Sequence, residues 1–153
     1  MPTTKRAKEI IQKIPYITIA SLSKDGEVWN APVYTAYDKY YNFYWGSHVG
    51  SQHSQNIAHS PNIFLVIYDS TATPGSGEGV YVRATAAEIA DSEEIKTVHQ
   101  LLWNRHVVPY WKIEQVQGDA PIRLYKAVPQ KVWMNDGAKI NGHYVDIRTE
   151  IQL

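Results

Sequence analysis

The chain contains no cysteine among its 153 residues. This absence excludes disulfide bonds, thiolate catalysis and cysteine-based zinc or iron–sulfur sites. The chain also has no net charge, because 15 basic residues balance 15 acidic ones. A neutral chain does not indicate nucleic acid or an anionic membrane surface as its partner. No apolar run approaches the roughly 20 residues that cross a bilayer, and the first residues lack the apolar segment of a secretory signal. We therefore expect a cytoplasmic protein.

Phenylalanine is scarce, with two residues, whereas there are five tryptophans and eleven tyrosines. Aromatic side chains that carry a polar group suit half-exposed pockets and interfaces better than a dry core. The length fits one domain, residues 1–153, that is large enough to bury a hydrophobic core.

Two longer helices are expected. The first covers residues 4–14, where Thr4 is the expected cap and Pro15 ends the helix; its apolar residues recur at the spacing of one helical face. The second begins at a capping box formed by Asp91 and Glu94 and ends near His106.

Strands dominate the rest of the pattern. Residues 63–68 form a continuous apolar run, which is typical of a strand buried on both faces. Pro32 cannot donate a ladder hydrogen bond, so the strand over residues 28–37 is expected at a sheet edge or a bulge. Short turns such as Asn141-Gly142 join neighbouring strands and favour an antiparallel barrel over a parallel sheet. The expected strands are residues 16–23, 28–37, 40–45, 63–68, 80–89, 122–128, 131–134, 139–140 and 143–147.

A glycine- and serine-rich turn follows the strand at residues 40–45 and leads into a short helix over residues 51–59. Free N–H groups at a helix start, together with the helix dipole, attract anions. Strand, turn and helix start therefore form a candidate phosphate site around Ser47 and Ser51. The alternative is an ordinary capped helix without a ligand.

A metal site is not expected. His48, His53 and His59 lie close in sequence, but the last two fall on different faces of the helix and no carboxylate accompanies them at ligand spacing. The sequence also lacks a nucleophile elbow, a Walker loop and a dinucleotide-binding glycine pattern.

A series of short motifs follows a fixed order along the chain. They are Ile19-Ala20-Ser21-Leu22-Ser23-Lys24-Asp25-Gly26, Val28-Trp29-Asn30-Ala31-Pro32-Val33-Tyr34, Phe43-Tyr44-Trp45-Gly46-Ser47, Ser51-Gln52-His53, Asn56-Ile57, Pro61-Asn62-Ile63, Gly79-Val80-Tyr81-Val82-Arg83-Ala84, Arg123-Leu124-Tyr125 and Lys131-Val132-Trp133. Through these motifs, residues 17–87 resemble the flavin-binding split barrel of the pyridoxamine 5'-phosphate oxidase-like superfamily, and the last two motifs resemble its closing strands. The fold that this implies is mainly β: a six- or seven-stranded antiparallel split barrel with Greek-key connections and α-helices, as in flavin reductases.

The resemblance implies a homodimer with FMN bound between the subunits. It places the FMN phosphate at Ser47, Ser51, Gln52 and His53, beside Trp45 and Gly46. Trp111 or Trp133 would cover the flavin from the partner subunit. The residues that would face the isoalloxazine ring are Trp29, Asn30, Ala31, Pro32, Val33 and Tyr34.

The implied function is an FMN-dependent oxidoreductase acting on an unidentified small molecule, with NADH or NADPH as electron donor. We nominate no catalytic side chain, because the flavin carries the electrons. The alternatives are a non-enzymatic flavin-, F420- or haem-binding or sensing dimer, with His48 or His143 as axial haem ligand. The resemblance does not imply pyridoxamine phosphate oxidation, because the Arg-x-His signature of that enzyme has no match after Trp133.

The phosphate motif departs from many relatives, which carry Arg-Lys where this chain has Gln52-His53. We expect His53 to lie on an exposed helix. A bound phosphate would raise its pKa above the usual 6.5.

Overall fold

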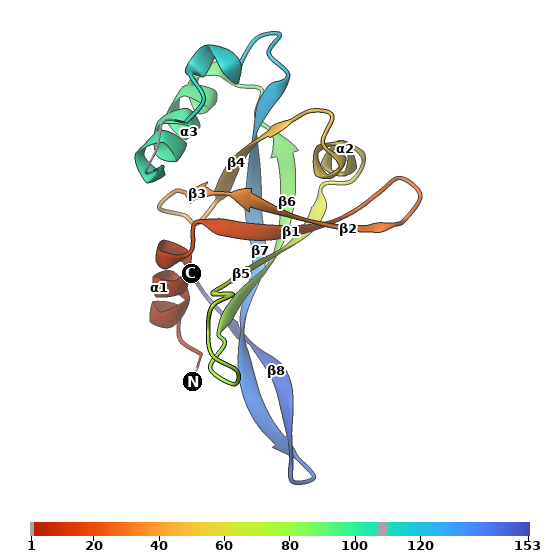
Figure 1. The fold of residues 1–153 in the computed structure, drawn as a ribbon, viewed down its shortest axis with the longest axis vertical. Coiled ribbons are helices and arrows are strands. Elements are labelled where there is room, and N and C mark those ends of the chain that lie inside the picture. Colours follow the sequence, from red (N-terminus) through yellow and green to blue (C-terminus); the bar gives the residue numbers. More distant parts are fainter. Residues whose placement is uncertain (1, 107–109) are drawn as a thin grey trace.

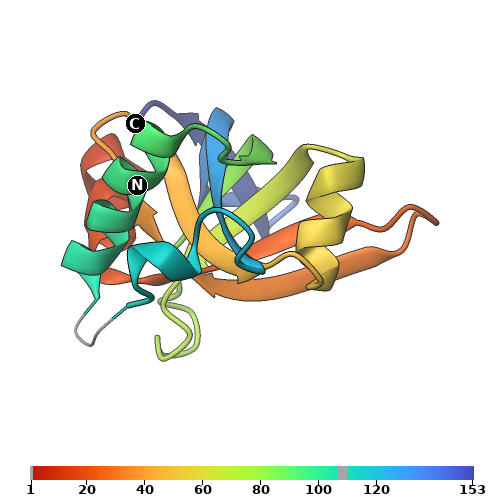
Figure 2. The same cartoon turned by 90° about the horizontal axis from the view of Figure 1, so that it is seen from above.

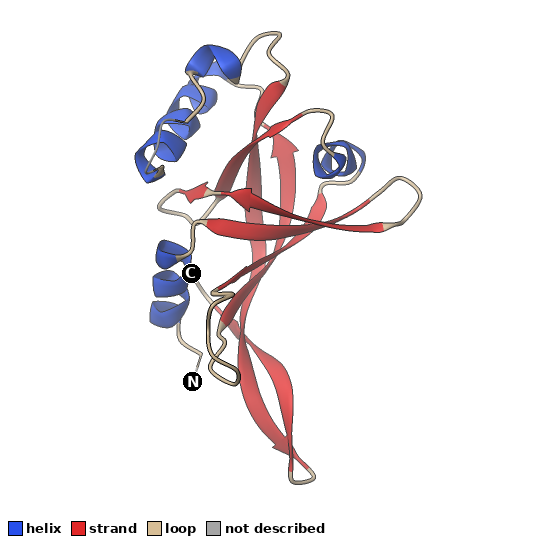
Figure 3. Cartoon of the chain, viewed as in Figure 1, coloured by secondary structure: helices blue, strands red, loops and turns tan. Residues whose placement is uncertain are grey.

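The computed structural model describes residues 2–106 and 110–153. Over these residues the chain forms one antiparallel sheet of eight strands, three α-helices and a short 3-10 helix (Figures 1 and 3). The elements are α1 (Thr4–Lys13), β1 (Tyr16–Leu22), β2 (Val28–Tyr34), β3 (Ala36–Tyr37), β4 (Phe43–His48), α2 (Gln52–His59), β5 (Asn62–Tyr68), β6 (Gly79–Glu88), α3 (Ser92–Arg105), η1 (Ile113–Gln115), β7 (Ile122–Ile140) and β8 (His143–Ile151).

The strand order is β2-β1-β5-β6-β7-β4-β3, with β8 also paired to β7. Strand β7 joins the parts of the sheet, because its first residues pair with β4, its middle with β6 and its last residues with β8. The mainly antiparallel, helix-bearing fold is confirmed. The structure has eight strands rather than the expected six or seven. The segment 28–37 divides at Thr35 into β2 and β3, and the three segments expected at 122–128, 131–134 and 139–140 form the single strand β7.

Two sequence expectations about single strands have different outcomes. Strand β2 lies at one end of the strand order, which confirms the edge position that Pro32 requires. Strand β5 was expected to be buried on both faces, and this was wrong: Ile63, Leu65 and Ile67 are buried, whereas Tyr68 is exposed. One face of β5 therefore lines the core and the other is partly open.

Helices α1 and α3 begin as their caps dictate. The N-cap of α1 is Thr3 rather than the expected Thr4, and its Oγ1 accepts a hydrogen bond from the N–H of Arg6 at 3.1 Å. The Asp91 carboxylate accepts one from the N–H of Glu94 at 2.8 Å, and α3 ends at Arg105 with His106 as its C-cap, in agreement with the expected end near His106. Helix α1 packs on the main core, and α3 covers a second apolar cluster around Tyr44 and Leu124. Both helices lie on the opposite side of the molecule from α2 (Figures 1 and 2).

The β7–β8 hairpin extends beyond the rest of the sheet (Figure 1). Asn141 and Gly142 form its turn with positive φ angles of 50° and 81°, which confirms the turn expected from the Asn-Gly pair. None of the helices in residues 2–106 and 110–153 is long and apolar enough to span a membrane.

Candidate functional site

The candidate phosphate site lies where β4 ends and α2 begins. Ser47 is buried, and its Oγ lies 2.7 Å from Nε2 of His53 and 3.3 Å from Oγ of Ser51. We call Ser47, Ser51, Gln52, His53 and the first-turn N–H groups of α2 the cradle. His53 is half-buried against Ser47, so the expectation that it lies exposed on the helix was wrong.

The start of α2 is open for an acceptor. Ser51 occupies the N-cap position, but its side chain makes no capping hydrogen bond to the helix. The first-turn N–H groups, which a capping serine would satisfy, therefore remain donors that the helix dipole makes attractive to an anion. Ser54 in the same turn is buried, and its hydroxyl lies near that of Tyr125 in a geometry short of a hydrogen bond.

The Gln52 side chain has a structural partner. Its amide donates to Oδ1 of Asn56 at 2.8 Å, and the buried Asn56 amide donates to Oγ of Ser21 at 3.0 Å. This chain of hydrogen bonds fastens α2 to β1. Gln52 therefore contributes its backbone N–H to the cradle more directly than its side chain.

The cradle carries little positive charge. Burial lowers the pKa of His53, which favours its neutral form near pH 7. Gln52 is neutral as well. The hydroxyl and N–H donors suit the oxygens of a phosphate, so the donor set fits FMN, but these residues do not balance its charge.

The β2 segment that the resemblance assigned to the flavin ring lies beside the cradle, because β2 contacts both α2 and β4. Val33 is buried in the core, and the Tyr34 hydroxyl donates to the backbone oxygen of Arg105 at 2.6 Å. The residues of this segment that remain exposed are Val28, Trp29, Asn30 and Pro32, and Ala31 is half-buried.

Trp45 and Gly46 have separate surroundings. Trp45 is fully buried, and its ring stacks on Tyr125 with ring centres 5.7 Å apart. Gly46 faces the other side, where a Cβ would collide with the Trp111 ring and the Tyr110 hydroxyl. Trp111 thus covers β4 of its own chain, on the face opposite to the one that carries Trp45 and Ser47.

Trp133 lies elsewhere in the chain, on the outer side of β7. Its ring stacks on Phe64 at 6.1 Å, and Arg83 lies over it at 5.6 Å. Arg148 lies over both Tyr81, at 4.1 Å, and Phe64, at 5.5 Å. We call these five residues the aromatic face. Within one chain, Trp133 is packed among them rather than in the cradle.

The two histidines considered as haem ligands differ in surroundings. Nδ1 of His48 accepts a hydrogen bond from the N–H of Gly50 at 2.9 Å. In the neutral ring the proton then lies on Nε2, whereas an axial ligand coordinates through an unprotonated nitrogen. His143 is exposed at the start of β8, at the end of the hairpin.

Sequence reasoning missed two residues of this site, Arg123 and Glu88. Arg123 is the cross-strand partner of Ser47, and its Nε lies 3.0 Å from a carboxylate oxygen of Glu88. Only the pairing of β4 with β7 brings Arg123 here, from 76 positions later in the sequence. The arginine was visible in the Arg123-Leu124-Tyr125 motif, but nothing local indicated its neighbour.

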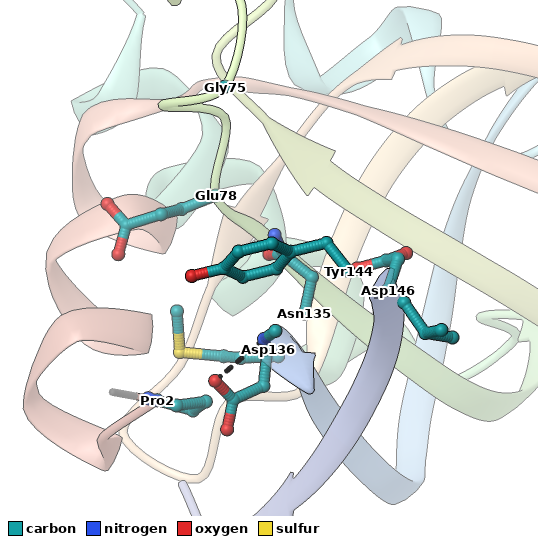
Figure 4. A pocket seen from close by; sticks show the side chains of 10 residues that line it. Pro2, Gly75, Glu78, Asn135, Asp136, Tyr144 and Asp146 are labelled. Carbon is teal, nitrogen blue, oxygen red and sulfur yellow. Dashed lines mark hydrogen bonds between the residues drawn. The ribbon is translucent and has the colours of Figure 1, made fainter. Parts of the chain in front are cut away.

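Away from the cradle, a hollow of about 420 Å³ lies between Pro2, the loop before β6 and the β7–β8 hairpin (Figure 4). The carboxylates of Glu78, Asp136 and Asp146 line it, around the ring of Tyr144. This lining disfavours a phosphate. In the described ranges no group of three or more histidine or acidic side chains is placed to hold a metal ion.

The fold is shared with several solved proteins. HutZ, a haem storage protein from Vibrio cholerae, has a TM-score of 0.74 at 17% identity, with 86% of this chain and 94% of that chain covered. ChuZ from Campylobacter jejuni has a TM-score of 0.73 at 18% identity, with 97% and 61% covered. A proposed 5-nitroimidazole antibiotic resistance protein from Bacteroides thetaiotaomicron has a TM-score of 0.73 at 12% identity, with 88% and 84% covered.

No curated protein sequence matches the chain significantly. The family profile described as pyridoxamine 5'-phosphate oxidase matches residues 3–136, which is most of the chain. The chain therefore belongs to the pyridoxamine 5'-phosphate oxidase family.

Proposed function

We propose that this chain is an FMN-dependent oxidoreductase that acts on a small molecule, with NADH or NADPH as electron donor. The observation that carries the proposal is the cradle, where the hydroxyls of Ser47 and Ser51 meet the open first turn of α2. Membership of an oxidase family supports a flavin as the occupant of this anion site. FMN, when bound, supplies the electron transfer, and the protein supplies binding and orientation.

The residues of this chain have separate tasks in the proposal. Ser47, Ser51 and the N–H groups of α2 donate hydrogen bonds to the phosphate oxygens. The β2 strand offers backbone groups to the ring, because one of its edges pairs with β1 and the described residues place no strand on the other. Pro32 interrupts the donors of this edge, which leaves room for a flat ligand.

The proposal includes a homodimer, the state in which proteins of this family are often found. The aromatic face is the surface that we assign to the contact. Next to it lies a groove of about 380 Å³, to which Leu22, Val28 and Phe64 contribute apolar side chains. Aromatic and arginine side chains are enriched in protein interfaces. We expect Trp133 of this face to cover the cofactor held by the other copy.

An absorption spectrum of the protein reconstituted with FMN tests the proposal. We expect tight binding of FMN, and bleaching of the flavin bands under anaerobic conditions when NADH or NADPH is added. Bound FMN that neither donor reduces favours the alternative, a non-enzymatic flavin binder. A protein that binds no FMN contradicts the proposal.

The same spectrum distinguishes the rival cofactors. One structural neighbour is an F420 reductase at 16% identity, and HutZ is a haem storage protein. Haem binding would give an intense absorption band that neither flavin nor F420 produces. The hydrogen bond from the N–H of Gly50 to Nδ1 of His48 counts against His48 as the axial haem ligand, because it leaves Nε2 protonated.

A further inference from the structure

Arg123 on β7 lies directly opposite Ser47 on β4. The register of β4 and β7 pairs Ser47 with Arg123 and Trp45 with Tyr125. The stacked rings of Trp45 and Tyr125 show that this row of pairs faces the inside of the barrel. Cross-strand partners on one face have Cβ atoms about 4.5–5.5 Å apart. The side chains of Arg123 and Ser47 therefore leave the sheet together, at the end covered by α2.

The Arg123 guanidinium is held in a fixed position. It donates to the backbone oxygens of Gly118, at 2.8 Å, and Ile122, at 3.1 Å, and its Nε pairs with Glu88 at 3.0 Å. Its side chain is only 20% exposed. A guanidinium has five N–H donors, and these three contacts use one each. Two donors remain for a further acceptor.

Without a ligand, the residues around the Arg123 guanidinium add no further positive charge, so the site attracts an anion only weakly. Glu88 offsets part of the positive charge of Arg123. His53, from α2, has its pKa lowered by burial, and Gln52 carries no charge. Arg123 is thus the permanent cation that the β4–β7 pairing adds to a cradle of neutral donors.

We propose that Arg123 determines the preference of the cradle for a phosphate ester and so replaces the cationic pair absent at Gln52-His53. Glu88 holds the guanidinium in place when no anion is bound and competes with the phosphate for it. This inference rests on the proposed function and names the residue that would distinguish a phosphorylated flavin from an unphosphorylated one.

FMN and riboflavin differ by one phosphate, so the ratio of their affinities isolates the effect. The experiment is a fluorescence titration of both flavins into the wild-type protein and its variants. We expect Arg123→Gln to reduce the preference for FMN about tenfold, the effect of losing about 1.4 kcal/mol, and to leave riboflavin affinity unchanged. Arg123→Lys keeps the charge and should retain most of the preference. Glu88→Gln should increase it.

Arg6→Gln is the matched control, because Arg6 is an ion-paired arginine on α1 that pairs with Glu9 and Glu78. It should leave both affinities unchanged. An equal loss of FMN and riboflavin binding in Arg123→Gln would assign Arg123 a structural role and overturn the inference. An unchanged ratio would overturn it as well.

Failure of the proposed function is distinguishable from failure of this inference. If the wild-type protein binds neither flavin, the proposed function fails, and inorganic phosphate then decides the role of Arg123. A phosphate-dependent rise in Tm that Arg123→Gln lacks, and that Arg6→Gln keeps, supports the inference. A rise equal in all three proteins, or in none of them, overturns it.

Discussion

The cradle and the aromatic face use polar residues in opposite ways. In the cradle, hydroxyl groups and a neutral imidazole surround the start of α2, and the adjacent Arg123 is already paired with Glu88. On the aromatic face, Arg83 and Arg148 lie over aromatic rings, with Arg148 only 4.1 Å from the ring centre of Tyr81. The first surface offers directed hydrogen bonds, and the second offers flat apolar area with cations spread above it.

This difference separates two tasks that a homodimeric cofactor protein must perform. A phosphate needs convergent N–H and O–H donors, and the cradle provides hydroxyl groups beside the first-turn N–H groups of α2, whereas the guanidinium groups of the aromatic face lie over rings. A second subunit needs apolar area with aromatic and arginine side chains, as on the aromatic face. Substitutions in the cradle should therefore alter cofactor affinity with little effect on subunit association. Loss of Trp133 should alter both properties, because we assign this ring to the subunit contact and to the cofactor of the other copy.

The largest expected effect is on association. Trp133→Ala removes the largest ring of the aromatic face, and truncation of a central interface tryptophan costs about 2–4 kcal/mol. We expect the dissociation constant of the dimer to rise at least thirtyfold, as measured by sedimentation equilibrium over a range of concentrations.

Trp103→Ala provides the comparison, because Trp103 is an exposed tryptophan on α3. It should dissociate like the wild-type protein. A Trp133→Ala variant that stays as dimeric as Trp103→Ala would remove the aromatic face from the interface, and a wild-type protein that is a monomer at micromolar concentration would contradict the dimer itself.

A smaller effect is expected on stability at the strand that bears the cradle. Gly46→Ala forces the ring of Trp111 and the hydroxyl of Tyr110 to move, because the new Cβ would collide with both. Overpacking of this kind costs about 1–3 kcal/mol of unfolding free energy, which urea denaturation measures.

Gly77→Ala is the matched change, since a Cβ at Gly77 has no heavy atom within 4 Å. Its unfolding free energy should stay within about 0.5 kcal/mol of the wild type. Equal stability of the two variants would mean that Trp111 does not cover β4 of its own chain, and it would leave Trp111 free for the partner subunit.

The sequence predicted the local features of the fold well, because local chemistry determines them. Pro32 correctly predicted an edge strand, Asp91 and Glu94 predicted the start of α3, and Asn141-Gly142 predicted the turn of a hairpin. The cap of α1 was misplaced by one residue. Strand β5 was misread because a continuous apolar run does not distinguish two buried faces from one.

The site was predicted only where its residues are neighbours in sequence. Ser47, Ser51 and His53 lie within one turn and one helix start, and the structure brings their side chains into contact. Arg123 could not be added, because its place beside Ser47 depends on a pairing of distant strands. The burial of His53 likewise depends on how α2 rests on the barrel, which periodicity over eight residues does not determine.

The smallest expected effect concerns the charge of the cradle and is the most direct test of its neutrality. Burial lowers the pKa of His53 in the folded protein without ligand. The unfolded chain then binds a proton more readily, so the stability that neutral His53 contributes is complete above its unfolded pKa of about 6.5. That stability is lost as the pH falls from there through the folded pKa. His53→Gln keeps a side chain able to contact Ser47 but cannot titrate, so its Tm should fall less between pH 8 and pH 5 than that of the wild type. His59→Gln, at the exposed end of the same helix, should follow the wild type.

Bound FMN should reverse the direction of the His53 pKa shift, because a nearby phosphate raises a histidine pKa and favours the protonated ring. Thermal melts of the three proteins with and without FMN check both directions. If His53→Gln keeps the wild-type pH dependence in both states, His53 neither titrates in the cradle nor faces the phosphate.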